Sequence, residues 1–394
     1  MRIAINAVAA QGGGSRTYLL HILKALAAAS RDHQFVVILS SRQRALLEAL
    51  PPRIQSVVCF GVPRQAGLRM AWEQTILPLL LARWHIDILY AAFDTAVLLS
   101  PVPVVLLSHN CDPFAPARLS RSVYGHARNV ILRFLSILSA RKARTVVFVS
   151  NSSAKMLAHK MRIPESKTRV VYHGWSPIQG TETDGCRLPE DLPKRYILSV
   201  ADLYPHKNLE VLLEAFQLLT AKGSYSGDLV LAGARRKNAW GYGRRLLALR
   251  ETLGCRDRIH FVGSIPHPHL FAVYQNAELF VFPSLYETFA LPLVEAMASH
   301  IPLVVADWRL APDGETDRIN VGPEICADAA EYFDPMDPRS FAVAMDRVLT
   351  DPRRREELVG RGWDRVQEFS WQRSASALLQ IFEDAVTRRE ARRS

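Results

Sequence analysis

The stretch VFPSLYETFALPLVEAMA, residues Val281–Ala298, decides the fold of the second half of the chain. The apolar run Leu279–Phe282, which overlaps its start, is typical of a short buried strand. After a polar turn, Leu291, Val294 and Ala298 repeat at the spacing of one apolar helix face. A strand, a turn and a helix N-terminus in this order form an anion site, because the first N–H groups of a helix are unpaired and its dipole favours negative charge. The alternative is an ordinary strand–helix unit of an α/β sheet.

Length and charge limit the organisation and the partners of the chain. A chain of 394 residues, 49% of them apolar, is long enough for two domains with a core each. Lysines and arginines number 49 against 38 aspartates and glutamates, so the net charge is +11. Such a balance indicates an acidic partner: nucleic acid, an anionic membrane or a phosphorylated substrate. The chain has no aromatic–basic RNA motif and no recognition helix, so we expect no nucleic-acid partner.

Cysteine spacing and the N-terminal sequence bear on the cellular compartment. The five cysteines are far apart and show no Cys/His ligand spacing, which fits a reducing cytosol and indicates neither a zinc site nor a disulfide framework. The N-terminal MRIAINAV begins as a strand, without the charged and apolar regions of a signal peptide. The longest apolar stretch, Ala96–Leu107, is too short for a transmembrane helix. We therefore expect a cytoplasmic protein.

Strand and helix patterns alternate through both halves of the chain, which predicts two doubly wound α/β domains with parallel sheets. Strands are predicted at Arg2–Val8, Phe35–Leu39, Gln55–Phe60, Ile86–Tyr90, Val102–Leu107, Thr145–Val149, Arg169–Tyr172, Tyr196–Val200, Leu229–Ala232, Arg258–Val262, Leu279–Phe282 and Pro302–Val305. Ser176–Lys194, rich in proline, glycine and acidic residues, is the predicted linker. The predicted domains are residues 1–178 and 190–370. A C-terminal helix with a basic tail, residues 371–394, is expected to pack back on the first domain.

Two polar segments of the first half follow predicted strands. The triple glycine Gly12–Gly14 precedes a helix and would let a ligand approach the backbone. It fits a dinucleotide fingerprint poorly because Thr17 stands at the third glycine position, and a surface turn is the alternative. His109 follows the strand that ends at Leu107, at the edge where doubly wound domains bind ligands. Its alternative role is to close that strand with a hydrogen bond.

The second half has cationic side chains after two of its predicted strands. Lys207 lies in ADLYPHKN, Ala201–Asn208, and Arg235 and Arg236 follow the strand that ends at Ala232. Each can neutralise a diphosphate through charge-assisted hydrogen bonds, worth roughly 1.5–3 kcal/mol apiece. The alternative for Lys207 is an ordinary charge in the first turn of a helix. No aspartate cluster has the spacing of a magnesium site, so these cations would have to do the electrostatic work.

A basic segment, Arg118–Arg144, is rich in arginine and lysine, contains no acidic residue and has apolar residues at helical spacing. A basic amphipathic helix of this kind can lie on an anionic membrane surface. Equally, its apolar face can pack on the sheet while its basic face stays in water. The sequence leaves both interpretations open.

The ordered set of these motifs resembles the retaining GT-B glycosyltransferases, most closely glycosyltransferase family 4, the glycosyl transferases group 1. Its centre is LYETFALPLVEAMA, whose usual text in that family is close to YEGFGLPxxEAMA. The match extends through Gly12–Gly14, WEQTILP at Trp72–Pro78, SHN at Ser108–Asn110, FVSNSSAK, HKN and PEICADAAEYFDP at Pro323–Pro335. The glutamate pair alone is a weak signal, whereas the ordered set covers nearly the whole chain. The resemblance implies two Rossmann-like domains facing a cleft.

The resemblance also implies roles for the matched residues. A nucleoside diphosphate sugar, GDP- or UDP-linked, would bind mainly to the C-terminal domain, with Glu295 on the ribose, Glu287 near the transferred sugar and Lys207 on the diphosphate. Thr288, Phe289, Ala290 and Leu291 would form the turn over the phosphates and the sugar. In the N-terminal domain, His109 would lie near the reacting sugar, and Gly13 and Gly14 would belong to the loop that closes on the donor. The expected catalytic residues are thus His109, Lys207 and Glu287.

The chain departs from the family pattern near the phosphates. The usual arginine five positions before the lysine is Asp202 here, so neutralisation of the diphosphate would depend on Lys207, Arg235 and Arg236. Two glycines of the family's EGFG are replaced by Thr288 and Ala290.

The function that these features predict is transfer of a hexose, of mannose or glucose type, from a nucleoside diphosphate sugar with retention of the anomeric configuration. The acceptor would be a hydroxyl of a glycan or a lipid-linked acceptor in cell-surface polysaccharide synthesis, and no metal or cofactor would be required. An anionic membrane surface that attracts Arg118–Arg144 would place the protein on the inner face of the membrane. The alternatives are a sugar-nucleotide epimerase of the same fold, which needs no acceptor, and a nucleotide-sugar-binding protein without catalysis, which Asp202 would suit.

Overall fold

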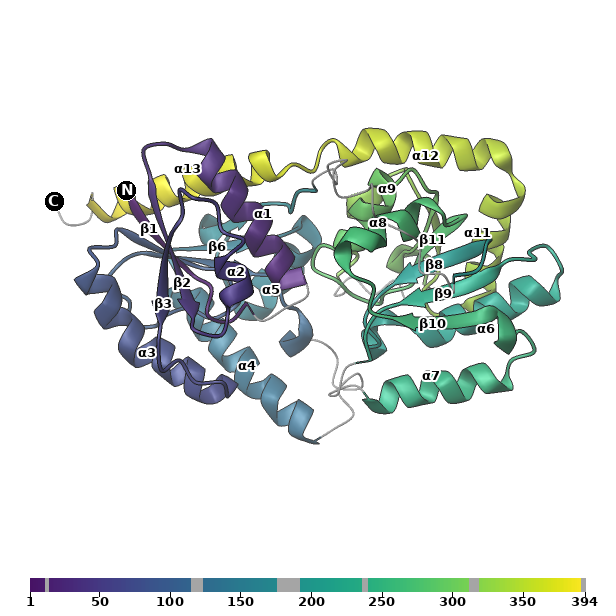
Figure 1. Ribbon diagram of the computed structural model, residues 1–394, viewed down its shortest axis with the longest axis horizontal. Coiled ribbons are helices and arrows are strands. Elements are labelled where there is room, and N and C mark those ends of the chain that lie inside the picture. The colour runs from purple at the N-terminus through teal and green to yellow at the C-terminus, as the bar shows by residue number, and fades with distance from the viewer. Residues whose placement is uncertain (11–13, 115–122, 176–191, 236–239, 312–318, 391–394) are drawn as a thin grey trace. The chain divides into compact units, whose positions relative to one another are not determined.

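The computed structural model describes the chain except for residues 11–13, 115–122, 176–191, 236–239, 312–318 and 391–394 (Figure 1). The chain divides into two compact units. The N-terminal unit comprises Met1–Ser176 together with Ser370–Ser394, and the C-terminal unit comprises Pro177–Phe369. Most of the predicted linker, residues 176–191, lies outside the described part of the chain.

The N-terminal unit is built on a seven-stranded parallel sheet in the order β3-β2-β1-β4-β5-β6-β7. Its strands are β1 Arg2–Asn6, β2 Gln34–Ser40, β3 Gln55–Cys59, β4 Ile88–Ala91, β5 Val104–Ser108, β6 Thr145–Phe148 and β7 Thr168–Val170. The central strands β1, β4 and β5 are buried along nearly their whole length, as expected for a parallel sheet covered on both faces. All seven strands were predicted from their apolar runs, and no end differs by more than two residues.

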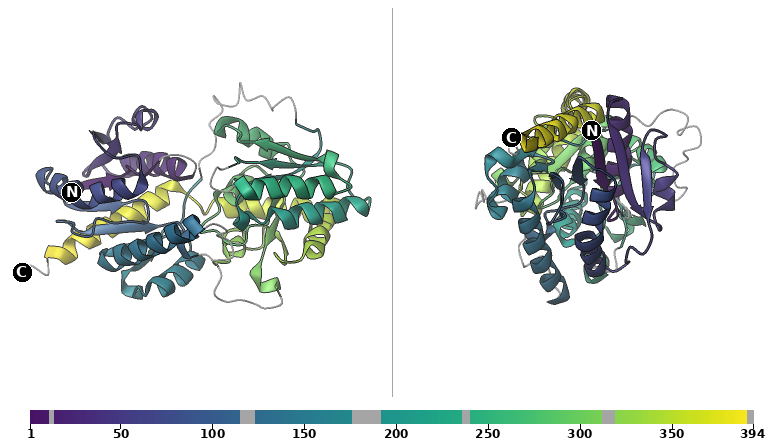
Figure 2. Two further views of the ribbon diagram at one scale, coloured as in Figure 1. Left: turned by 90° about the horizontal axis from the view of Figure 1, so that it is seen from below. Right: turned by 90° about the vertical axis from the view of Figure 1, so that its left-hand side faces the viewer.

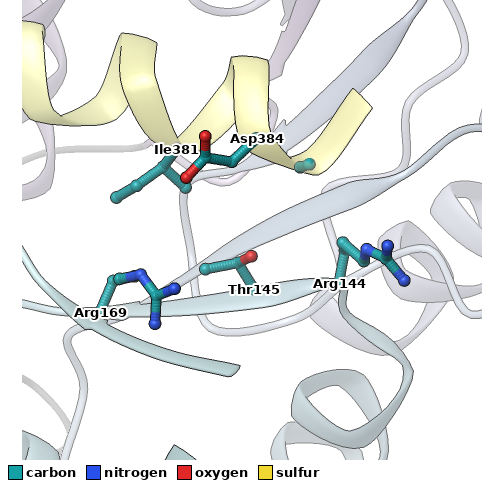
Figure 3. Close-up of a pocket in the computed structure, with 6 residues that line it drawn as sticks. Arg144, Thr145, Arg169, Ile381 and Asp384 are labelled. Carbon is teal, nitrogen blue, oxygen red and sulfur yellow. The ribbon is translucent and has the colours of Figure 1, made fainter. Parts of the chain in front are cut away.

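Helices cover this sheet, and the C-terminal helix is one of them. The described helices are α1 Gly14–Ala29, α2 Arg44–Leu47, α3 Ala66–Arg83, α4 Val123–Lys142, α5 Asn151–Met161 and α13 Trp371–Glu390, with 3-10 turns η1 Asp112–Phe114 and η3 Glu165–Lys167. Figures 1 and 2 show α13 running alongside α1. At the far end of α13, Ile381 and Asp384 lie opposite Thr145 and Arg169 around a cavity of only about 10 Å³ (Figure 3). The last helix is therefore packed into the N-terminal unit.

The C-terminal unit has a six-stranded parallel sheet in the order β10-β9-β8-β11-β12-β13. Its strands are β8 Tyr196–Val200, β9 Asp228–Ala232, β10 Ile259–Gly263, β11 Leu279–Phe282, β12 Leu303–Ala306 and β13 Glu331–Phe333. Its helices are α6 Leu209–Ala221, α7 Trp240–Thr252, α8 His267–Gln275, α9 Leu291–Ala298, α10 Val321–Cys326, α11 Pro338–Thr350 and α12 Pro352–Val366, with 3-10 turns η4 Pro205–Lys207, η6 Arg256–Arg258 and η7 Trp308–Leu310. The sequence pattern missed α10 and β13, because segments of six and three residues are too short to show a period.

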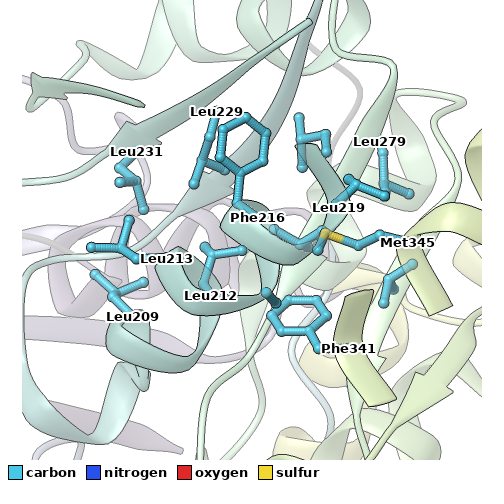
Figure 4. Packing of buried hydrophobic residues seen from close by; sticks show 14 of the residues in the cluster. Leu209, Leu212, Leu213, Phe216, Leu219, Leu229, Leu231, Leu279, Phe341 and Met345 are labelled. Atoms are coloured by element: carbon cyan, nitrogen blue, oxygen red, sulfur yellow. The ribbon is translucent and has the colours of Figure 1, made fainter. Parts of the chain in front are cut away.

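The core of the C-terminal unit lies between its sheet and helices α6 and α11 (Figure 4). Leu212 and Phe216 of α6, which are fully buried, face strand residues such as Leu229 and meet Phe341 of α11. The rings of Phe341 and Phe333 stack at 3.7 Å between centroids. The confirmed architecture is two parallel-sheet α/β units, each with its own core.

In each sheet the strand order reverses direction at one point, and doubly wound units bind their ligands at this point. The reversal lies between β1 and β4 in the N-terminal unit and between β8 and β11 in the C-terminal unit. Neighbouring connections leave a doubly wound sheet in opposite directions there, so a crevice forms at the carboxyl ends of those strands. The loops after β1 and β4, and after β8 and β11, consequently lie at these two points, and the loop after β5 is the next one along the N-terminal sheet.

Arg162→Gly is expected to raise the free energy of unfolding by about 0.5–1 kcal/mol. Arg162 ends α5 in the left-handed region, at φ 55° and ψ 50°, where a side chain is strained and glycine is not. Urea denaturation would measure the change. Lys155→Gly is the matched control, because Lys155 is exposed within α5 and glycine there should instead cost about 1 kcal/mol. Two variants that are destabilised alike would contradict the assignment of strain.

Candidate functional site

Lys207 and Glu287 form an ion pair at the reversal point of the C-terminal sheet. Lys207 ends η4, in the loop after β8, and Glu287 lies in the loop after β11. The two loops are joined by a backbone hydrogen bond from Leu285 N–H to the carbonyl of His206, 2.8 Å long. The side chains of Lys207 and Glu287 are only 15% and 19% exposed. Residues 80 positions apart thus meet at the carboxyl edge of the sheet.

The turn that follows Glu287 brings the start of α9 to the same edge. Thr288, Phe289 and Ala290 are buried, and Leu291 is the first residue of α9. Ala290 has φ 64° and ψ 66°, the left-handed conformation that glycine adopts without strain. The resembled family has glycine at this position, and the structure shows that alanine keeps the glycine-type backbone. The N-terminal N–H groups of α9 therefore remain directed along the helix axis, where an anion would be stabilised.

Glu295 is held in place by a buried tyrosine. The hydroxyl of Tyr274, on α8, donates a hydrogen bond to Oε2 of Glu295, 3.0 Å away. Burial, together with the charge of Glu295, raises the pKa of Tyr274 well above its usual range, so the phenol stays a donor. One oxygen of the carboxylate is fixed in this way, while Glu295 itself is half-buried on α9.

Asp202, which stands at the position of the family's usual arginine, has a structural role. Its Oδ1 accepts a hydrogen bond from the backbone N–H of Ala234, 2.8 Å away, and so joins the loops after β8 and β9. Gly233 is needed at this junction, because an added Cβ would lie 1.9 Å from the carbonyl oxygen of Ala201. Arg235 follows directly and is exposed, whereas the predicted Arg236 lies outside the described residues. The aspartate shapes the turn that presents Arg235.

In the N-terminal unit, His109 is held by an aspartate that sequence reasoning missed. Oδ1 of Asp94 accepts hydrogen bonds from the backbone N–H groups of His109 and Asn110, at 2.8 and 2.9 Å. Its Oδ2 lies 3.6 Å from Nε2 of His109. Asp94 has φ 54° and follows β4, at the reversal point of the sheet, while His109 follows the neighbouring strand β5. One carboxylate therefore holds the backbone at His109 and lies close to its ring.

A cluster of aromatic rings lies against His109 and was not predicted either. Tyr18 of α1 packs edge-on to His109, and its ring centroid lies 4.7 Å from that of the buried His173. Trp371, the first residue of α13, lies 5.9 Å from Tyr18, and the hydroxyls of Tyr18 and Tyr90 are hydrogen-bonded. Because these residues come from distant parts of the chain, no local spacing could have indicated the cluster.

Acid is expected to destabilise the N-terminal unit through His173. Burial, with a smaller effect of His109, lowers the pKa of His173 from 6.5 to about 3. Between these two pH values the unfolded chain binds a proton that the folded chain does not. The free energy of unfolding contributed by His173 is therefore fully present above pH 6.5 and falls by about 1.4 kcal/mol for each pH unit below it.

Denaturant titrations of the wild type and of His173→Gln between pH 7 and pH 5 would measure this contribution. The wild-type stability should fall more steeply with acid than that of the variant, by the slope given above. Parallel pH profiles for the two proteins would contradict the prediction.

The two glycines predicted to close on the donor, Gly13 and Gly14, lie at or just before the start of α1. Gly14 is exposed at the first residue of α1, and an added Cβ there would meet no atom within 4 Å. Gly13 falls outside the described residues. Within the described part of the chain, no three His, Cys, Asp or Glu side chains are grouped to hold a metal ion. That the reaction requires no metal stays a prediction from the sequence.

Two family models match the chain in succession. The model described as Glycosyltransferase Family 4 matches residues 12–177, and the model described as Glycosyl transferases group 1 matches residues 182–363. The first segment contains Asp94 and His109, and the second contains Lys207, Glu287 and Glu295. The two matched segments follow the division of the chain into its two sheets.

Relatives and solved structures agree with this assignment. The serotype-specific mannosyltransferase WbdA of Escherichia coli is 32% identical over 192 residues, which are 48% of this chain and 22% of that protein. The chain thus spans about a fifth of the length of this relative. The sucrose-phosphate synthase of Thermosynechococcus elongatus has the same fold, with a TM-score of 0.73, 20% identity and 98% of each chain covered. HepE of Anabaena, solved with UDP-glucose, has a TM-score of 0.70 and 17% identity over 98% of this chain and all of that one.

The resemblance that the sequence motifs indicated is confirmed by these matches. Parallel sheets in both units, the paired loops at each reversal point and the two successive models lead to one conclusion. The chain belongs to the GT-B glycosyltransferases of the group 1 and family 4 type.

Proposed function

We propose that this protein is a retaining glycosyltransferase that moves a hexose of mannose type from a nucleoside diphosphate sugar to a hydroxyl of a glycan or lipid-linked acceptor. The observation that carries the proposal is the Lys207–Glu287 pair at the reversal point of the C-terminal sheet, beside the N-terminus of α9. The similarity to a mannosyltransferase favours mannose as the sugar. Synthesis of a cell-surface polysaccharide is the process in which we place the reaction.

The proposed binding mode assigns a partner to each charged group. The diphosphate would replace Glu287 as the partner of Lys207, with the first N–H groups of α9 and Arg235 adding positive potential. Glu287, released from the lysine, would accept hydrogen bonds from the hydroxyls of the sugar. Glu295, fixed by Tyr274, would accept hydrogen bonds from the ribose, whose nucleotide base would be that of GDP or UDP.

In the proposed reaction, the protein stabilises the negative charge that develops on the leaving diphosphate. As the bond from the anomeric carbon to the phosphate oxygen breaks, negative charge grows on the diphosphate and positive charge on the sugar. Lys207 and the α9 N-terminus oppose the first charge in place of a metal ion. The acceptor hydroxyl attacks the face that the diphosphate leaves, and its proton passes to a phosphate oxygen, so the configuration is retained. His109, oriented by Asp94, would contact the reacting sugar.

A thermal-shift panel of nucleotide sugars tests donor binding. The true donor, at 100 times its dissociation constant, should stabilise the protein by about 2.7 kcal/mol, which is a shift of a few degrees. NMR of the product anomer then tests retention. Consumption of the donor to an epimeric nucleotide sugar without acceptor would instead indicate an epimerase. Binding without turnover against any acceptor would indicate a binding protein.

We also propose that α4 contacts an anionic membrane where a lipid-linked acceptor would lie. Val130, Ile131 and Phe134 are 55%, 59% and 65% exposed on α4, which is unusual for apolar side chains of a helix. Exposed cations lie on the same helix, at Arg128, Arg133, Arg141 and Lys142. Exposed apolar residues beside arginine and lysine are what an interfacial helix uses. Among the described helices, none is both long and apolar enough to cross a membrane.

Vesicle co-sedimentation tests the membrane proposal. Binding should require phosphatidylglycerol in the vesicles, weaken with salt, and drop when Arg133, Arg141 and Lys142 are changed to glutamine. Each of these charges should contribute about 1 kcal/mol near the surface. Binding that salt and these substitutions leave unchanged would contradict it.

A further inference from the structure

A second cavity, of about 330 Å³, lies within the N-terminal unit and is lined by four arginines. Arg16 comes from the first turn of α1, Arg42 from the loop after β2, Arg64 from the loop after β3 and Arg69 from α3. Among the residues that the structure describes, no acidic side chain lines the cavity. Four guanidinium groups around one hollow repel each other unless an anion joins them, so this lining favours a polyvalent anionic ligand.

The backbone around this cavity is held by a glutamine rather than by the ligand. Nε2 of Gln43 donates hydrogen bonds to the carbonyl oxygens of Ala7 and Ala10, at 2.8 and 2.7 Å. Oε1 of Gln43 accepts hydrogen bonds from the N–H and hydroxyl of Ser40. The loops after β1 and β2 are therefore tied together, and the cavity wall is formed before any ligand binds.

The charges of the arginines are only partly balanced. Nε of Arg69 lies 3.6 Å from Oε1 of the buried Glu73, and within the described part of the chain neither atom has a hydrogen-bond partner. For Arg42 and Arg64, both exposed, no ion pair with a carboxylate is present among the residues that the structure describes. The oxygens of a phosphate group would accept hydrogen bonds from the N–H groups of these guanidinium groups.

Apart from the arginines, Ser40 and Gln43, the described lining is apolar, which indicates that the anion is attached to an organic group. Val8, Leu46, Val62 and Pro63 form this part of the wall. The volume is in the range of sites for organic ligands and exceeds what one phosphate needs. The cavity also lies at the carboxyl edge of the sheet that carries His109, after β1, β2 and β3.

We propose that this cavity binds the phosphate or pyrophosphate group of a phosphorylated acceptor. Arg42 and Arg64 would be the main side chains that bind this group. The inference rests on the proposed function in one respect: His109 on the same sheet edge is taken to be where the transferred sugar arrives. The phosphate would anchor the acceptor at the cavity and leave its hydroxyl free to reach that edge. A soluble sugar phosphate and a lipid-linked pyrophosphate share this chemistry.

Calorimetric titration with inorganic pyrophosphate tests the cavity directly. In Arg42→Gln/Arg64→Gln the affinity should fall at least tenfold, because two charge-assisted contacts are lost. The matched control is Arg31→Gln/Arg53→Gln, which removes the same charge from exposed positions of the same unit outside the cavity and should change the affinity less than twofold. The titrations are made in a Lys207→Ala background, so that binding at the donor loops is weakened equally in all proteins.

Equal pyrophosphate affinity in the two double variants, or no binding by the parent protein, would overturn the inference. The affinity of the nucleotide selected by the thermal-shift panel, measured with Lys207 intact, should be the same in both double variants. If no nucleotide binds, the proposed donor site fails, while the pyrophosphate result still decides on the cavity. A hexose phosphate and geranyl pyrophosphate, titrated in parallel, distinguish the two acceptor sources, since the correct one should bind more tightly than inorganic pyrophosphate.

Discussion

Lys207→Ala is expected to lower kcat/KM by about 10²–10³-fold with folding unimpaired. The lysine lies at the sheet reversal point and is in contact with Glu287. Its ammonium group would stabilise charge that develops on the leaving diphosphate, so its removal raises the barrier more than it weakens donor binding. Steady-state kinetics with the donor and acceptor found in the screens would measure both effects.

Loss of Lys207 also leaves Glu287 without its partner, and this must be separated from the loss of chemistry. Lys222→Ala is the matched control, because Lys222 also pairs with a carboxylate of the C-terminal unit, Asp346, but is 66% exposed and lies outside the loops at the reversal point. Both variants should keep a melting temperature within a few degrees of the wild type. An Lys207→Ala enzyme whose kcat/KM stays within tenfold of wild type would remove the basis of the proposed mechanism.

Asp94→Ala is expected to reduce kcat by about 10²-fold, while the KM for the donor changes little. The aspartate accepts two backbone hydrogen bonds and approaches Nε2 of His109, so its removal releases the loop that carries the histidine. Each partly buried N–H group left without a partner costs about 1–3 kcal/mol, which displaces His109 rather than the donor loops of the other unit.

Asp94→Asn discriminates between positioning and charge. Asparagine tolerates the left-handed backbone of this position and its amide oxygen can still accept both N–H bonds, so kcat should recover to within about tenfold of the wild type. Asp87→Ala is the control for loss of an aspartate that accepts a backbone N–H bond, since Asp87 is exposed and binds the N–H of Arg2. If Asp94→Asn were as inactive as Asp94→Ala, the charge of the carboxylate rather than its hydrogen bonds would be required.

The strands and most helices could be predicted because their apolar periods are local. The run Leu279–Phe282 was predicted with the bounds that the structure has for β11. The three residues of β13 could not be recognised, since a strand so short is defined by its pairing with β12 and not by its own pattern.

The candidate site was predicted in part for a similar reason. Lys207 and Glu287 were recognised by position after strands and by family text, but their pairing depends on the order of the strands in the sheet. Asp94 carries no motif, and Asp202 was noted as the replacement of the family's arginine, while its hydrogen bond to the N–H of Ala234 was not foreseen. A side chain that acts by accepting distant N–H groups has no signature in its neighbours along the chain.

By itself, the sequence determined the class of fold and the family, and it predicted residues after the strands as partners of a diphosphate and a sugar. These follow from local periodicity and from short motifs whose meaning is carried by adjacent residues. Only the tertiary structure decided that Asp94 holds His109, that four arginines surround one cavity, and that Ala290 keeps a glycine-type turn. The first two features depend on atoms that the sheet topology brings together, and the third depends on a backbone angle. The spacing of residues along the chain predicts neither of these.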